Sequence, residues 1–255
     1  MLVTVFCLFG FNNVGSAQPG TSGINGTNAS LGGRFYHPRG IAIDSSSSNL
    51  YVADTHNHTI RKIVLSTGAV TTLAGTAGAS GSADGKGAAA RFNEPHDVAI
   101  DSTDTNLYIV DGGQTVRKIV LATDVVTTIA GKAEVAGDSN GKGAEARFFR
   151  PSGIAVDSAG ANLYIIENGN RSIRKIVIKS GLVTTIAGTA DSEASLADGT
   201  GAGARFHSPE RISIDSAGSN LYVADKTIRK INPILTFKKT LNKWRNLLLV
   251  ALAKT

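Results

Sequence analysis

The chain of 255 residues contains one series of motifs four times over. Its clearest marker is an Arg-Phe pair, whose copies lie 57, 56 and 58 residues apart: Arg34-Phe35, Arg91-Phe92, Arg147-Phe148 and Arg205-Phe206. A repeat of this length constrains the fold strongly, because each copy must form one structural unit that packs against the next. The sequence therefore predicts a repeat architecture over residues 34–231.

Each copy contains short runs rich in Val, Ile, Thr and Tyr that end at Gly, Asp, Asn or Ser, which is typical of β-strands and turns. The first copy has four runs, at residues 40–44, 49–54, 60–63 and 70–75. The first three runs recur at 98–101, 106–109 and 116–119, at 154–157, 162–165 and 173–176, and at 212–215, 220–223 and 228–231. The fourth recurs at 126–129 and 183–186, and it has no clear copy after Ile231.

The composition of these runs predicts how the strands are placed. The first run is almost wholly apolar, so we expect it to be buried on both faces, whereas the third mixes charge with aliphatic residues and is expected nearer solvent. One four-stranded sheet cannot bury both of its faces, but sheets packed radially can. We therefore expect an all-β propeller of about four four-stranded blades, either a closed four-bladed ring or an incomplete ring.

Residues 1–33 carry no charged side chain, and two interpretations of them differ. An apolar run followed by small residues fits a secretory signal with a cleavage site near Ala17, but no basic residue precedes the run. Residues 3–6 also resemble the Val-Thr-Thr strand, and they could supply the missing fourth strand of the last copy and close the ring. Residues 234–237 are the local alternative for that strand. We favour the strand interpretation, and with it a cytoplasmic location over secretion.

Residues 232–255 depart from the repeat as a basic tail. They hold five Lys or Arg residues and no acid, so the formal charge of +6 leaves +1 for the rest of the chain (6 − 5 = 1). A nearly neutral propeller weakly disfavours a nucleic-acid surface. The tail predicts an amphipathic helix over 235–253, from apolar residues at Phe237, Leu241, Trp244, Leu248 and Leu252. Such a helix can contact a membrane surface or a partner, or it can simply pack on the propeller.

In order, the motifs Pro-x-Gly-Ile-Ala-Ile-Asp, Asn-Leu-Tyr-Val-Ala-Asp, Asn-His-x-Ile-Arg-Lys-Ile and Val-Thr-Thr-Leu-Ala-Gly resemble the NHL-repeat family over roughly residues 3–231. The tripeptide of the family name is partly retained, as Asn57-His58-Thr59. Family members are typically six-bladed propellers. The resemblance implies a binding scaffold, since family roles are mostly protein binding, with RNA binding in some ubiquitin-ligase-linked members and lyase activity in a few relatives.

Few residues form a pattern that indicates catalysis. The chain has no nucleophile elbow, zinc-protease motif or phosphate-binding loop, and its single Cys7 excludes an internal disulfide. Asp84, Asp138 and Asp198 lie in Asp-Gly-type turns and are interpreted as turn formers rather than calcium ligands. Asp44, Asp101, Asp157 and Asp215, at the ends of the first strands, are expected to cap turns. In each Arg-Phe pair, Arg is expected to brace the loop and Phe to insert between blades. We expect no enzyme activity, no cofactor and no metal.

Connectivity predicts which loops meet. In an up-and-down sheet, the loop that enters strand one and the turn between strands two and three lie at the same end. All five histidines belong to these loops, and loops on a rigid scaffold commonly carry binding. We expect this end to bind a protein partner, with RNA binding at the same face as the alternative and a propeller lyase as the second alternative. The candidate residues are His37, Arg39, His56, Asn57, His58, His96, Gln114, Arg150, Asn168, Arg171, His207, Glu210 and Arg211.

Overall fold

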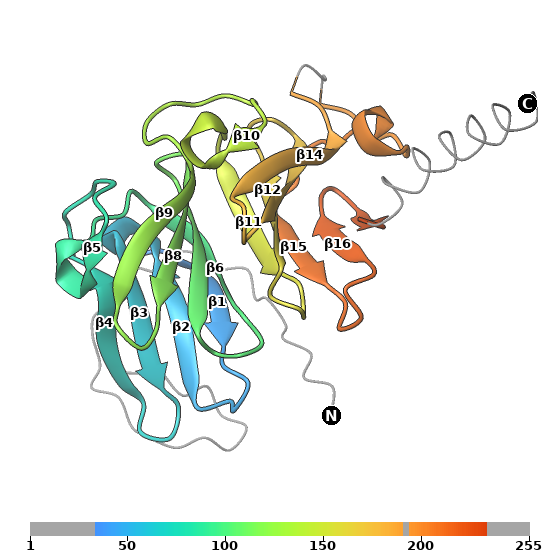
Figure 1. Cartoon of the computed structure of the whole chain (residues 1–255). Coiled ribbons are helices and arrows are strands. Elements are labelled where there is room, and N and C mark those ends of the chain that lie inside the picture. Colours follow the sequence, from blue (N-terminus) through green and yellow to red (C-terminus); the bar gives the residue numbers. More distant parts are fainter. Residues whose placement is uncertain (1–33, 191–193, 234–255) are drawn as a thin grey trace, which may run out of the picture.

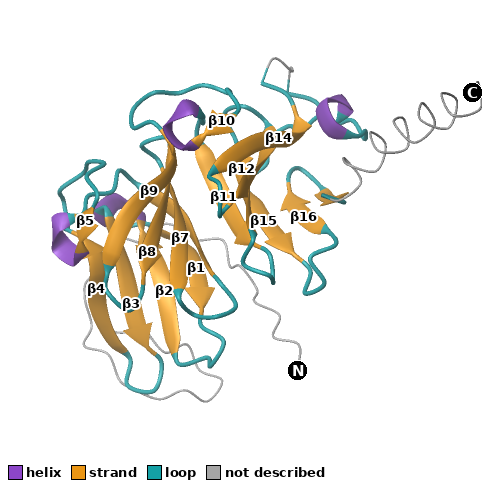
Figure 2. Cartoon of the chain, viewed as in Figure 1, coloured by secondary structure: helices purple, strands orange, loops and turns teal. Residues whose placement is uncertain are grey.

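A computed structural model describes residues 34–190 and 194–233 as four antiparallel sheets that follow one another along an arc (Figure 1). Each sheet is one sequence repeat, and the only helices among these residues are short 3-10 turns (Figure 2). The predicted all-β arrangement of four propeller blades is confirmed. In the part of the chain that the structure describes, no helix is long and apolar enough to cross a membrane.

Within each blade the strands lie side by side in chain order, and the first strand lies at one edge of the sheet. Blade 1 comprises β1 (Pro38–Ile43), β2 (Asn49–Asp54), β3 (Thr59–Val64) and β4 (Ala69–Gly75), with the turn η1 (Thr55–Asn57). Blade 2 comprises β6 (Pro95–Ile100), β7 (Asn106–Asp111), β8 (Thr115–Val120) and β9 (Val125–Gly131). Blade 3 comprises β11 (Pro151–Val156), β12 (Asn162–Glu167), β13 (Ser172–Val177) and β14 (Leu182–Gly188). Blade 4 comprises β15 (Arg211–Ile214), β16 (Leu221–Ala224) and β17 (Ile228–Ile231).

The long loops between blades add small elements that the sequence did not predict. The strands β5 (Gly85–Lys86) and β10 (Gly141–Lys142) pair with β9 and β14, so blades 2 and 3 have five strands. The turns η2 (Gly87–Ala89), η3 (Gly143–Glu145) and η4 (Gly201–Gly203) precede the Arg-Phe pairs. Blade 4 has three strands among the described residues. The predicted strand at 3–6, its alternative at 234–237 and the predicted helix at 235–253 lie outside the described residues.

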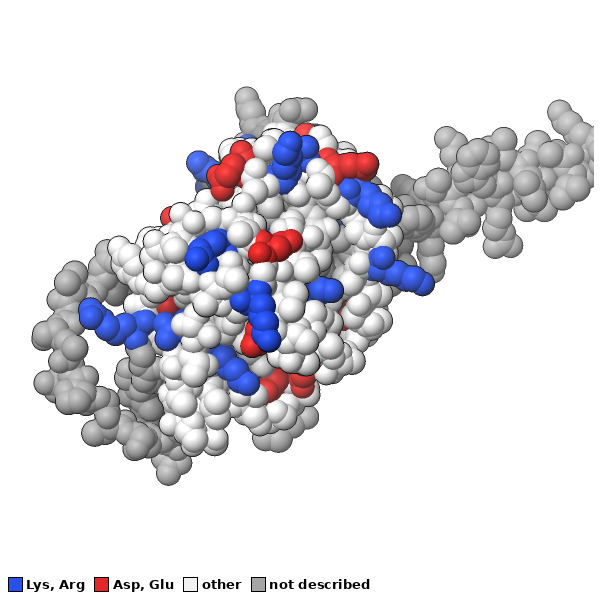
Figure 3. All heavy atoms as spheres, turned by 60° about the vertical axis from the view of Figure 1, so that its left-hand side comes forward, with Lys and Arg blue, Asp and Glu red and all other residues white. Residues whose placement is uncertain are grey.

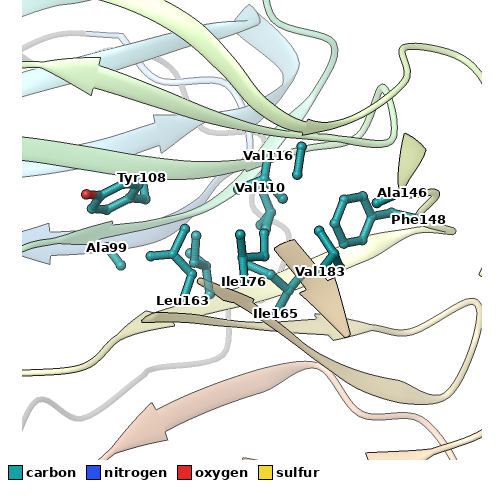
Figure 4. Packing of buried hydrophobic residues seen from close by; sticks show 12 residues of the cluster. Ala99, Tyr108, Val110, Val116, Ala146, Phe148, Leu163, Ile165, Ile176 and Val183 are labelled. Carbon is teal, nitrogen blue, oxygen red and sulfur yellow. The ribbon is translucent and has the colours of Figure 1, made fainter. Parts of the chain in front are cut away.

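The core consists of apolar side chains packed between successive blades. Between blades 2 and 3, Tyr108, Val110 and Val116 meet Leu163, Ile165 and Ile176 (Figure 4). The first strand is largely buried in β6 and β11, as predicted, but β1 is mostly exposed. The position of a blade in the array, rather than its sequence, therefore decides how much of its first strand is buried.

The third strand contradicts the prediction that it lies nearer solvent. Arg117 and Arg174, in its Ile-Arg-Lys motif, are fully buried. The Arg174 Nη1 donates to Glu167 Oε2 at 2.8 Å and to the Arg147 carbonyl at 2.9 Å, while its guanidinium lies 5.3 Å from the centre of the Phe148 ring. Burial of the arginine is tolerated because a carboxylate, carbonyls and an aromatic face replace its hydration. The charge of the Ile-Arg-Lys motif therefore did not indicate that its arginine is exposed.

The Arg-Phe pairs and turn aspartates are structural. Phe92 is buried beneath Arg117, and Arg91 Nη1 donates to the carbonyls of the η2 turn, so both predicted roles are confirmed there. Asp44 accepts from the Ser48 and Asn49 backbone N–H groups, as predicted for a turn cap. Asp84 differs from the prediction, because its carboxylate pairs with Arg117 at 2.7 Å instead of capping its own turn.

Candidate partner-binding site

A pocket of about 870 Å³ lies at the end of the blades that carries the loops entering the first strands. All four blades contribute residues to it, because the first strands of successive blades pack side by side. The lining residues are Arg39, Glu94, His96, Gly112, Gln114, Phe149, Arg150, Ser152, Asn168, Ser208, Glu210 and Arg211. Seven of the thirteen predicted residues are among them: Arg39, His96, Gln114, Arg150, Asn168, Glu210 and Arg211.

One repeat position supplies a pocket residue from every blade. This position follows the proline of the first strand, and it is occupied in turn by Arg39, His96, Ser152 and Glu210. From blade 1 to blade 4 the side chain at this position is in turn cationic, aromatic, a hydroxyl and anionic, while the surrounding motif is repeated. A position that varies within an otherwise regular motif was the signal that could have identified Ser152, which the sequence analysis missed along with Glu94, Phe149 and Ser208.

The next position controls how closely the strands approach. It is Gly40 in blade 1, where an added Cβ would lie 2.4 Å from the Asp97 Cα of blade 2, so no side chain fits without a shift. In blades 2 and 4 the same position carries Asp97 and Arg211. Small residues thus bring the first strands together, and two charged side chains are placed among them.

The charged side chains of the pocket are not paired with one another. The three cations are Arg39, Arg150 and Arg211, and the two anions are Glu94 and Glu210. None of the five forms an ion pair with a described residue. Arg211 Nη1 donates to the Ser152 carbonyl at 2.9 Å, and the Arg150 guanidinium lies 5.4 Å from the Phe149 ring centre. These groups therefore keep hydrogen-bonding capacity for a partner.

His96 is held as a neutral acceptor at the pocket wall. Its Nδ1 lies 3.1 Å from the Pro151 carbonyl oxygen, which can only accept, so Nδ1 carries the proton and Nε2 carries the lone pair. Burial lowers the pKa of the imidazole, and the charges of Arg39 and Arg211 lower it further, while the Pro151 carbonyl and Glu94 act in the opposite direction. The ring is thus expected to stay uncharged near neutral pH.

Below this pocket lies a second cavity, of about 380 Å³, which shares Arg39 and Arg211 with it. Ile41, Val98 and Ile154 give it apolar walls. Asp97 also lines it, and its carboxylate accepts from the backbone N–H groups of Val98 at 3.0 Å and Ile154 at 3.2 Å. Burial raises the pKa of Asp97 to about 6, although Arg211 and both backbone donors act to lower it.

Several predicted residues, including two that line the pocket, join one blade to the next. His58 Nδ1 accepts from the Glu94 backbone N–H at 3.1 Å, and Gln114 Oε1 accepts from that of Arg150 at 3.3 Å. Asn168 Nδ2 donates to Ser208 Oγ and to the Pro209 carbonyl, each at 3.2 Å. Each contact links one blade to the next. These residues hold the rim of the pocket in place.

The remaining predicted residues lie outside the pocket. His37 and His56 have ring centres 4.4 Å apart and form a cluster with Tyr36 in blade 1. Asn57 Nδ2 donates to Asp54 Oδ2 at 2.8 Å. Arg171 and His207 complete the set. Arg171 has a left-handed backbone (φ 49°). The His207 backbone N–H donates to Asp225, and His207 Nδ1 is buried. In residues 34–190 and 194–233, no three His, Cys, Asp or Glu side chains are grouped as they would be to hold a metal ion.

Comparison with known proteins identifies the repeat. The NHL repeat profile matches residues 35–63. Among relatives, NHL repeat-containing protein 2 is 29% identical in Bos taurus over 227 residues, which cover 78% of this chain and 31% of that protein. The resemblance of the chain to the NHL-repeat family is thus confirmed. The NHL-repeat chain is also 28% identical to Protein SUPPRESSOR OF QUENCHING 1, chloroplastic, of Arabidopsis thaliana, covering 78% of this chain and 20% of that one. It thus spans about a third or less of these relatives.

Solved structures share the fold of this NHL-repeat chain. A Bacteroides thetaiotaomicron protein of unknown function has a TM-score of 0.62 and 28% identity, and the match covers 76% of this chain and 47% of that one. A Bacteroides thetaiotaomicron chain titled a putative phosphatase is 19% identical, with a TM-score of 0.58 over 76% and 47% of the two chains. At that identity the likeness concerns the fold alone.

Proposed function

We propose that the protein is a non-enzymatic scaffold that binds a partner protein in the pocket of about 870 Å³. The observation that supports this most is that five charged side chains from all four blades meet at one pocket without pairing with one another. Charged groups left unpaired on a rigid surface are suited to a partner that supplies the opposite charges. The resemblance to the NHL-repeat family agrees with an interaction scaffold.

The pocket chemistry indicates a partner segment that carries both charge signs. The guanidinium groups of Arg39 and Arg150 offer forked donors to a carboxylate. Glu94 and Glu210 accept from cations or backbone N–H groups, and His96 Nε2 accepts from a neutral donor. A peptide loop or terminus presents this mixture of groups. Like-charge contacts with the same residues would disfavour other partners.

The charge distribution favours a protein over RNA. A surface that binds RNA by its phosphates gathers Lys and Arg, because each contact neutralises a phosphate charge. Figure 3 shows Lys and Arg interspersed with Asp and Glu on the face that it presents. Both acidic residues of the pocket would also repel a phosphate chain. RNA binding is therefore the alternative outcome of the test.

The test uses a charge reversal that spares the fold. Arg39 and Arg150 are exposed and have no ion pair among the described residues, so Arg39→Glu with Arg150→Glu leaves the packing intact. The matched control is Lys86→Glu with Lys142→Glu, which makes the same charge change on the exposed outer strands β5 and β10. A displayed peptide library is selected on the full chain, and the selected peptides are titrated against all three proteins by calorimetry.

We expect peptide affinity to fall by at least tenfold in the Arg39 and Arg150 variant and to be retained in the control, because only the former loses charge-assisted bonds. Equal binding by both variants, or selection of no peptide at all, would contradict the proposal. Titration with a random-sequence single-stranded RNA completes the experiment. RNA affinity that falls steeply with salt and is lost in the pocket variant would favour the alternative function instead.

A further inference from the structure

The acidic residue that ends the second strand is buried in blades 1 to 3, so its carboxylate needs donors from the protein. In blade 1, Asp54 Oδ2 accepts from the side-chain amide of Asn57 at 2.8 Å, and Arg61 lies 3.3 Å from the same oxygen. In blade 3, Glu167 Oε1 accepts from the side-chain amide of Asn170 at 2.9 Å. An asparagine of the turn after the second strand thus serves this carboxylate in both blades.

Blade 2 has no asparagine at this place in the turn. Gly113 stands there instead, and its carbonyl accepts from the Glu134 N–H at 3.0 Å, as the Asn57 carbonyl accepts from the Gly78 N–H at 3.2 Å. Blade 1 therefore combines Asn57 with Gly78, whereas blade 2 combines Gly113 with Glu134. Gly78 and Glu134 both have a left-handed backbone, which is uncommon for a glutamate. A donor amide is thus replaced by a second carboxylate.

The two carboxylates of blade 2 face the same space. From the point where a Cβ on Gly113 would lie, Glu134 Oε1 is 3.2 Å away and Asp111 Oδ2 is 3.7 Å away. Asp111 is fully buried, and its Oδ2 accepts no hydrogen bond from the described residues. Arg117 Nη1 lies 3.5 Å from that oxygen, while Nη2 of the same guanidinium pairs with Asp84 at 2.7 Å. A buried carboxylate oxygen without a donor indicates that a ligand completes the site.

The charges of this cluster do not balance. Arg117 is shared between Asp84 and Asp111 in blade 2, whereas in blade 3 Asn140 replaces the first of these carboxylates and accepts from Arg174 at 3.0 Å. One arginine therefore faces two carboxylates in blade 2, with Glu134 as a third acidic group beside them.

The pKa of Asp111 agrees with an excess of negative charge. Burial raises this pKa to about 7, and the charge of Glu134 acts in the same direction, while Arg117 and the Asn93 N–H act to lower it. A cation placed between the two carboxylates would offset both the burial and their mutual repulsion.

We propose that Asp111 Oδ2 and Glu134 Oε1 bind a Ca²⁺ ion in the space beside Gly113. Carboxylates are hard oxygen ligands of the kind that Ca²⁺ prefers, and water completes its coordination in many sites. Asn93 fixes both ligands, because its N–H donates to Asp111 Oδ1 at 2.8 Å and its Nδ2 donates to Glu134 Oε1 at 2.9 Å. Two charged ligands predict weak binding, with a Kd of about 10⁻⁴–10⁻³ M. At this site we depart from the expectation, drawn from the sequence, that the chain holds no metal.

The site lies within the array and beside the rim of the partner-binding pocket. Blade 2 packs against a described blade on each side. Glu94 and Gly112 line the pocket and adjoin Asn93 and Gly113 in the sequence. A bound ion would therefore hold two loops of blade 2 that carry pocket residues. The inference rests on the contacts within blade 2 and does not depend on the proposed function.

The experiment titrates the full chain, freed of metal by a chelator, with CaCl₂ by calorimetry at about pH 8, where Asp111 is ionised. Gly113→Asn with Glu134→Gly transplants the blade 1 arrangement, and the asparagine fits because the nearest remaining atom lies 3.4 Å from its Cβ. Glu134→Gln is a second variant, which removes the charge and keeps the shape. Asp124→Asn is the matched control, because it removes a carboxylate at the opposite end of β9.

We expect the wild type and the Asp124 control to bind Ca²⁺ and to gain at least about 2 °C in melting temperature at about 10 mM Ca²⁺. Both Glu134 variants should bind at least tenfold more weakly, and without Ca²⁺ the transplant should melt no lower than the wild type. A wild type that does not respond to Ca²⁺ would overturn the proposal. Equal responses in the wild type and the Glu134 variants would also overturn it, since surface carboxylates would then bind the ion adventitiously.

Discussion

Blades 3 and 4 share most of their sequence motif but differ in what surrounds it. Blade 3 has five strands and a neighbour on each face, and its Arg174 is enclosed with Glu167. Blade 4 has three strands among the described residues and one uncovered face, and its Arg229 pairs with Asp198, whose side chain is almost fully exposed. The comparison teaches that a repeated residue contributes to stability according to its neighbours, because burial governs both packing and electrostatic terms.

The largest expected difference concerns the third-strand arginines. Arg174→Ala leaves the buried Glu167 carboxylate without its cation, and we expect a loss of about 3–5 kcal/mol in the free energy of unfolding. Arg229→Ala breaks a pair that water already screens, and we expect a loss of about 1 kcal/mol or less from that ion pair. Urea denaturation of both variants measures the two losses. Equal losses would mean that burial does not distinguish the two blades.

A second comparison tests the face of blade 3 that packs on blade 4, and the equivalent face of blade 4. Ile173→Ala opens a cavity in the packed contact between blades 3 and 4, and we expect it to cost about 2–5 kcal/mol. Ile228→Ala removes the same atoms from a mostly exposed side chain, and we expect a change within about 0.5 kcal/mol. The free energies are measured by urea denaturation. A substantial cost at Ile228 would contradict the exposure of its side chain.

The smallest effect is a pH dependence caused by Asp97. Its folded pKa of about 6 lies above the unfolded value, so between these values the folded carboxyl binds more protons than the unfolded one. Stability from this group is therefore highest below pH 4 and falls as the pH rises to about 6. The stability of wild type relative to Asp97→Asn should fall by about 2–3 kcal/mol from pH 4 to pH 7.

Asp215 in blade 4 should give a pH dependence of stability with the opposite sign, because its pKa is lowered rather than raised. The Asn220 side chain lowers the pKa of Asp215, with backbone donors from Ser219 and Asn220 adding to the effect. Stability from this turn cap is therefore present above the unfolded pKa and is lost as the pH falls through the folded value. Chemical denaturation of Asp215→Asn across the same pH range should show the reverse trend. Trends of the same sign in both variants would contradict the assigned burial of Asp97.

Repetition in the sequence was sufficient to predict the blades and their loop ends. The spacing of the Arg-Phe pairs located each repeat, and strand composition located the first three strands of every blade. The connectivity rule brought Arg39, Arg150 and Glu210 to one end, where the structure places them around one pocket. The same rule also placed His58 among the binding candidates, although its side chain accepts a hydrogen bond from the Glu94 N–H of the next blade. The sequence gives no sign of that contact.

The local sequence determined the strands, turns and caps, because these depend on residues close together along the chain. Asp44 caps its own turn wherever its blade lies. Only the tertiary structure decided which equal motifs are buried: Ile173 and Ile228 share a motif, yet a neighbouring blade covers one and leaves the other exposed. Arg117 is a second example. Its charge predicted exposure, but in the folded chain it is buried and pairs with Asp84 and Asp111. Burial depends on contacts between distant segments, and a repeat carries the same local pattern whether or not a neighbour is present.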